Sequence, residues 1–157
     1  QAVETLGHAE HHFVYLFDDV CFSGDIGGVR PAGQRILRLP MPPPEFNLEK
    51  WRVSLQRMRD LKFKQIAPTH FGPFDDPDWH LQAIESELER IDAWISATLP
   101  ACSSVEDVST RFMDWTKQRY AAEQVAPSQV EFFETANPSW MSPAGIHRYW
   151  RKHRSQD

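Results

Sequence analysis

The sequence has 157 residues, of which 41% are hydrophobic and 12% aromatic, a composition typical of one folded globular domain rather than of a disordered chain. A formal net charge of -5 and an isoelectric point near 5.8 argue against nucleic acid or an anionic membrane as the main partner, since both select clustered lysine and arginine. No apolar run approaches the roughly 20 residues that span a bilayer, so we expect a cytoplasmic protein.

The first part of the chain is expected to form a small sheet. Three short β-favouring runs are predicted, at residues 2–6, 13–17 and 20–23. Asp18 and Asp19 can form the tight turn that joins the second run to the third in a hairpin. The prolines of residues 37–47 exclude a helix or a central strand, which predicts an extended surface segment there.

A helix and a further strand follow this segment. Asn47 is a plausible N-cap for a helix over 48–60, in which Trp51, Leu55 and Met58 form an amphipathic stripe. A β run over 63–67 then ends at Pro68 and delivers His70 to a loop. The order of hairpin, helix, strand and loop predicts an α/β domain.

The remainder of the chain is expected to be helical. Helices are predicted at residues 78–98 and 105–123, with a last short helix that begins at Ser142 and Pro143. In the first of these helices, Ile84, Leu88, Ile91 and Ile95 share one face, and the acidic residues Glu85, Glu87 and Glu89 are expected off it. Three histidines are expected at helix surfaces, namely His80, His147 and His153.

Three polar side chains are expected to meet at one edge of the sheet. His8 precedes a strand, Asp25 follows the next, and His70 follows a third, where loops of α/β proteins build their sites. Imidazole and carboxylate suit zinc, manganese or iron, and one carboxylate can bridge two ions. The same residues could instead be a buried histidine and two turn residues with no metal.

Two neighbouring features could support such a site. Because side chains alternate along a strand, at most one of His11 and His12 should approach the metal ligands. We expect His12 to orient a metal ligand, for example by donating a ring N–H to it. Arg30 could reach a substrate carboxylate or phosphate, although a surface arginine is the simpler expectation. Cys21 and Cys102 lie far apart and predict neither a disulfide nor a thiolate zinc site.

The segments "GHAEHH", "FSGD" and "PTHFG" occur here in the order and at the separations of the later motifs of metallo-β-lactamase-fold hydrolases. The chain resembles that family over residues 5–75. The resemblance implies that His8 binds a first metal, that Asp25 bridges both metals and is catalytic, and that His70 binds a second. It also implies zinc, as two ions, with manganese or iron as alternatives, and a bridging hydroxide that attacks a small-molecule ester, thioester, lactone or related bond. "PTHFGP" with a helical tail is similar to the glyoxalase II-like branch.

The His-x-His-x-Asp-His signature of the family does not occur in these residues. The chain thus resembles the C-terminal half of the αββα sandwich over residues 1–98, with a helical C-terminal extension over 99–157. Activity would then require an N-terminal half-domain that supplies the missing ligands. Because Gln1 is not a translation start, we expect further residues before it. The alternatives are a non-catalytic half-domain that assembles with a partner chain and a purely structural α/β protein, and a homodimer is left open.

Overall fold

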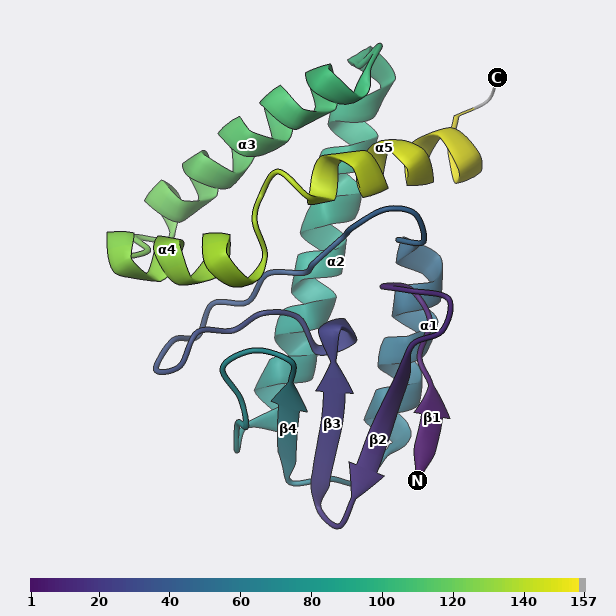
Figure 1. Ribbon diagram of the computed structural model, residues 1–157, viewed down its shortest axis with the longest axis vertical. Coiled ribbons are helices and arrows are strands. Elements are labelled where there is room, and N and C mark those ends of the chain that lie inside the picture. The colour runs from purple at the N-terminus through teal and green to yellow at the C-terminus, as the bar shows by residue number, and fades with distance from the viewer. Residues whose placement is uncertain (156–157) are drawn as a thin grey trace.

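The computed structural model describes residues 1–155 (Figure 1). Four strands form one sheet in the order β1-β2-β3-β4, with β1, β2 and β3 antiparallel and β4 parallel to β3. The strands are β1 (Ala2–Glu4), β2 (Phe13–Phe17), β3 (Val20–Gly24) and β4 (Gln65–Pro68). The helices are α1 (Leu48–Asp60), α2 (Pro77–Thr98), α3 (Val105–Ala122), α4 (Pro127–Ala136) and α5 (Ser142–His153), with short 3₁₀ helices η1 (Asp25–Gly27) and η2 (Leu99–Ala101). This confirms the α/β class, and none of the helices within residues 1–155 is long and apolar enough to cross a membrane.

Helices α1 and α2 cover one face of the sheet, behind the strands in Figure 1. The predicted cap of α1 is confirmed, because the Asn47 side chain accepts a hydrogen bond from the Lys50 backbone at 2.9 Å. Trp51 on its apolar stripe is fully buried and donates its indole N–H to the Ile26 carbonyl at 3.2 Å. The predicted stripe of α2 is also buried, including Ile84 at 0% exposure.

The opposite face of the sheet is aromatic and exposed. Alternate residues of β2 project to this face together with one residue of β3, and their exposures are 42% for Phe13, 57% for Tyr15, 70% for Phe17 and 49% for Phe22. Tyr15 and Phe22 are directly paired across the two strands. We call these four aromatic residues the aromatic sheet face. Because they are neighbours on one face of adjacent strands, they expose more apolar surface in one place than isolated exposed side chains do.

The proline-rich segment over residues 37–47 was predicted to be extended at the surface; Pro43 and Pro44 are exposed as expected, but the surface placement is wrong for its apolar side chains. Leu37, Leu39, Met41 and Phe46 are 2–4% exposed. All four side chains belong to the main core, and Leu37, Leu39 and Met41 reach it as alternate residues of the segment. Gly145 of α5 packs directly on it, with an added Cβ falling 2.1 Å from the Met41 carbonyl oxygen.

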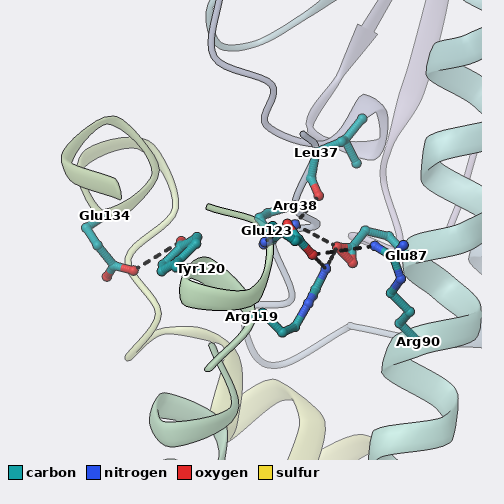
Figure 2. A network of polar contacts seen from close by, with 8 residues as sticks. All are labelled: Leu37, Arg38, Glu87, Arg90, Arg119, Tyr120, Glu123 and Glu134. Carbon is teal, nitrogen blue, oxygen red and sulfur yellow. Dashed lines mark hydrogen bonds and ion pairs between the residues drawn. The ribbon is translucent and has the colours of Figure 1, made fainter. Parts of the chain in front are cut away.

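Glu87 was expected off the apolar face of α2, and this too is wrong, since it is 2% exposed. Arg38 of the proline-rich segment bonds to its carboxylate at 3.2 Å, and Arg119 of α3 bonds to the same oxygen (Figure 2). Both arginines also contact Glu123, Arg38 at 2.6 Å and Arg119 at 3.3 Å. We call these four residues the charge cluster. The exposed carboxylate that the periodicity of α2 predicts is covered by a later helix, which supplies compensating charge.

Helix α4 has no counterpart among the predicted elements. Phe133 anchors it in a second apolar cluster with Val29 and Tyr120, and the Tyr120 and Phe133 rings stack at 5.8 Å between centroids. Pro127 occupies its first turn, a position that proline favours. Phe112 of α3 and Ile146 of α5 belong to the main core, so the division of the chain at residue 98 stays a prediction.

Candidate metal centre

The three metal ligands predicted from the sequence converge at one end of the sheet. His8 lies in the loop between β1 and β2, Asp25 opens η1 directly after β3, and His70 lies in the loop after β4. The Nε2 atom of His8 is 3.6 Å from Asp25 Oδ2, and the Nε2 atom of His70 is 3.9 Å from Asp25 Oδ1. The two imidazoles therefore face different oxygens of one carboxylate.

The loop that carries His8 is fixed to the start of α1. Gly7 has φ 130°, and an added Cβ would lie 2.5 Å from the backbone nitrogen of Trp51. The Gly7 carbonyl accepts a hydrogen bond from the Asn47 backbone at 2.8 Å. Only glycine allows this close approach with a positive φ, which gives a physical reason for the Gly-His pair in the sequence.

The ring of His8 is held from two sides. Its Nδ1 atom lies 3.1 Å from the Pro40 carbonyl oxygen, to which a protonated Nδ1 can donate. The Trp51 ring meets it edge-on, at 6.0 Å between centroids and 89°. A carbonyl at Nδ1 favours the tautomer whose lone pair is on Nε2, the atom that faces Asp25. A lone pair on Nε2 that is directed in this way is suited to bind a metal ion.

His12 lies beside this group, whereas His11 points to solvent. The Nδ1 atom of His12 is 3.0 Å from the Thr5 hydroxyl, and its ring lies 6.0 Å from that of His8. Burial and then the neighbouring His8 lower the pKa of His12 to about 4, so the ring is neutral near pH 7. The side chain of His11 is 89% exposed. A ligand-orienting role for His12 stays a prediction.

Arg30 is placed differently from the sequence expectation. It is 6% exposed and bonds to both carboxylate oxygens of Asp76, at 2.6 and 3.0 Å. Its guanidinium lies 4.2 Å from the centroid of Phe74 and 4.3 Å from that of Trp79. The surface placement is therefore wrong, and the guanidinium is committed to an internal ion pair, because aromatic rings on both sides exclude solvent around it.

His80 was expected at a helix surface, and it is fully buried beneath the candidate site. Its Nε2 atom donates to the Gly27 carbonyl at 2.7 Å and so ties α2 to η1, which carries Asp25. Its position four residues before Ile84, on the apolar stripe of α2, was the signal that could have identified it.

Replacement of His80 by glutamine is expected to reduce the acid sensitivity of the fold. Burial lowers the pKa of His80 from 6.5 to about 4, although the hydrogen bond to Gly27 acts in the opposite direction. Between these pH values the unfolded chain binds the extra proton, so the stability conferred above pH 6.5 is lost as the pH falls towards 4, by about 3 kcal/mol in total. The amide of glutamine can donate to Gly27 without titrating. Urea unfolding at a series of pH values measures this, and an unchanged slope in H80Q would contradict it.

Within residues 1–155, no three His, Cys, Asp or Glu side chains form a group that could hold one metal ion. The distances above agree with this, since each histidine approaches only one oxygen of Asp25 and the two histidines are not joined to each other. A carboxylate with one histidine near each of its oxygens leaves room in this arrangement for a metal ion on each side of Asp25. Each ion would then have two donors from this chain and would need others.

Comparisons with known proteins agree with the sequence motifs. Residues 2–70 match the family model described as the metallo-beta-lactamase superfamily. The matched residues make up less than half of the 157-residue chain. The metallo-beta-lactamase fold-containing protein ST1585 of Sulfurisphaera tokodaii is 36% identical over 70 residues, which are 45% of this chain and 26% of that protein.

Similarity to solved structures extends to the helices at the end of the chain. The metallo-beta-lactamase family protein TTHA1429 from Thermus thermophilus superposes on 97% of this chain and 44% of its own, with a TM-score of 0.52 and 18% identity. The crystal structure of ST1585 from Sulfolobus tokodaii covers 58% of this chain and 32% of its own, with a TM-score of 0.46 and 28% identity. The chain thus spans about a quarter of the length of the curated relative that it matches and less than half of either solved chain.

Proposed function

We propose that this chain supplies His8, Asp25 and His70 to the dinuclear site of a metal-dependent hydrolase. The observation that carries the proposal is that the Nε2 atoms of two histidines from separate loops face different oxygens of the Asp25 carboxylate, at 3.6 and 3.9 Å. A carboxylate that directs one oxygen towards each of two cations is the arrangement that a bridging ligand needs. The match to the superfamily over residues 2–70 supports the same assignment.

The residues of this chain have distinct tasks in that reaction. When bound, two divalent ions, zinc or alternatively manganese or iron, would activate a water molecule and polarise the scissile carbonyl of the substrate. His8 is oriented for ligation by the Pro40 carbonyl. Asp25, whose side chain is 36% exposed, can also accept a hydrogen bond from the attacking water and orient it. The substrate is a small molecule with an ester, thioester, lactone or related bond, and the "PTHFGP" segment with helices α3 to α5 favours the glyoxalase II-like branch.

Further ligands must come from elsewhere, and the aromatic sheet face offers a place for the part that brings them. The 157 residues contain no His-x-His-x-Asp-His string. Two sheets that pack face to face bury alternate side chains of both in a common core. We propose that an N-terminal half-domain with those ligands packs on the aromatic sheet face, whether it belongs to the same polypeptide or to another.

The test is metal removal from the purified protein, with its intact mass recorded. In the protein that also carries the N-terminal half-domain, we expect about two divalent ions per molecule by elemental analysis and hydrolysis of an ester or thioester that a chelator abolishes and zinc restores. A metal-free protein that hydrolyses the ester equally well before and after chelation would contradict the proposal.

A non-catalytic role is the second candidate, and the exposure of the aromatic sheet face is the observation that favours it. A half-domain of this kind would bind metal poorly by itself and would acquire it when mixed with a partner that carries the His-x-His-x-Asp-His ligands. Metal content before and after mixing, measured together with the appearance of hydrolysis, separates this candidate from the enzyme. A homodimer remains a further proposal for the occupant of this face.

A further inference from the structure

Two phenylalanines lie next to the candidate metal centre, and we call them the aromatic lip. Phe71 directly follows His70, and their ring centroids are 6.2 Å apart. The ring of Phe132, from α4, lies 5.7 Å from that of Phe71 in an edge-on arrangement. His70 in turn reaches Asp25 at 3.9 Å. A chain of short contacts therefore joins the helical extension to the proposed bridging carboxylate.

A residue other than Phe132 anchors α4 in the apolar core. The next residue, Phe133, is 1% exposed and anchors the helix in the second apolar cluster. Phe132 remains 50% exposed despite its contact with Phe71, which is itself 38% exposed. The pair therefore presents free aromatic surface to solvent beside His70, where a purely structural contact would bury both rings more completely.

The backbone at Phe71 is also unusual. Its φ of 63° lies in the left-handed region, which aromatic side chains rarely adopt. Such conformations persist where the surrounding structure requires them, and they are common at functional sites. Here the conformation accompanies the placement of the ring between His70 and Phe132.

We propose that the aromatic lip contacts an apolar acyl chain of the substrate and determines which chain lengths are accepted. This inference rests on the proposed hydrolase function and identifies a substrate class for the same site. An apolar group fits better than an anionic one because the lip is aromatic, while Arg30, the side chain that could have met an anion, is paired with Asp76. Contact between the exposed rings and methylene groups next to the scissile carbonyl removes apolar surface from water and so stabilises substrate binding.

Phe132→Ala is the decisive variant, and Trp140→Ala is its matched control. Trp140 is an exposed aromatic residue of the same helical extension, 68% exposed, and it is not paired with Phe71. The ratio of kcat/KM for p-nitrophenyl octanoate to that for p-nitrophenyl acetate is measured in the zinc-loaded protein that includes the N-terminal half-domain. We expect F132A to lower this ratio about tenfold and W140A to leave it unchanged, with equal metal content in all three proteins.

Binding of the product acids provides a readout that does not depend on hydrolysis. Octanoate and acetate are titrated into each protein, with and without zinc, and followed by NMR at Phe71 and the residues around it. Preference for octanoate that is lost in F132A and kept in W140A supports the lip, even if the protein proves to have no hydrolytic activity. If metal binding and hydrolysis are intact but F132A keeps the wild-type chain-length preference, the proposed role of the aromatic lip is overturned while the hydrolase proposal stands.

Discussion

Replacement of Glu87 by alanine is expected to lower the free energy of unfolding by about 3 to 5 kcal/mol, the cost typical of breaking a buried ion pair from one side. Glu87 is 2% exposed, and its carboxylate serves both Arg38 and Arg119. Burial works against the charge of Arg119, but the hydrogen bond to Glu87 raises the pKa of that guanidinium above its ordinary value. Alanine would leave two buried cations with Glu123 as their shared partner.

The control for this variant is Glu89→Ala, on the same helix. Glu89 is exposed, so its replacement should change the free energy of unfolding by about 0.5 kcal/mol or less. Guanidinium unfolding followed by tryptophan fluorescence measures both variants. Equal stability of E87A and E89A would show that the charge cluster does not hold α2, α3 and the proline-rich segment together.

In the protein that also carries the N-terminal half-domain, replacement of Asp25 by alanine is expected to remove both metal ions. Asp25 is the only one of the three proposed ligands that faces the other two, at 3.6 Å from His8 and 3.9 Å from His70. Without its carboxylate, each ion would keep one histidine from this chain and would lose the negative charge that offsets repulsion between two cations. Elemental analysis after gel filtration measures the loss, and hydrolysis should fall with it.

Asp19→Ala is the matched control for this loss. The Asp19 side chain is 61% exposed and pairs with Lys64 at the far end of the hairpin, so the metal content should not change. Circular dichroism measures whether D25A keeps its secondary structure, and so separates loss of a ligand from loss of the fold. We expect the fold to be kept, since the hydrogen bond from Gly28 at 3.0 Å is accepted by the backbone of Asp25 and not by its side chain. A folded D25A protein that retains two ions would show that Asp25 is a turn residue.

Much of the fold follows from local patterns in the sequence. The stripe at Trp51, Leu55 and Met58 identifies the buried face of α1 because a helix with an apolar stripe must bury it. The order of the strands brings His8, Asp25 and His70 to one end of the sheet. The loops that follow β3 and β4 lie side by side because those strands are parallel, and β2, which His8 precedes, is antiparallel to β3 and so begins at the same end. Both inferences use contacts between neighbouring elements.

The errors arise where a distant segment decides the environment. Glu87 has the spacing of an exposed residue and is buried only because α3 brings Arg119 over it. Residues 37–47 have the prolines of a surface segment, yet the apolar side chains among them are buried, and α5 packs on the segment at Met41. The lip contact between Phe71 and Phe132 joins residues far apart in the chain, and no local period indicates such a pair.

The two margins of the sheet differ in their ability to accept another strand. At β4, Ile66 exchanges backbone hydrogen bonds with Phe74, at 3.0 and 2.9 Å, so the outer edge of that strand is already occupied. Within residues 1–155, β1 pairs with β2 alone. The edge beyond β1 is therefore the more open of the two to a further strand, and it is the margin opposite β4, whose following loop carries His70.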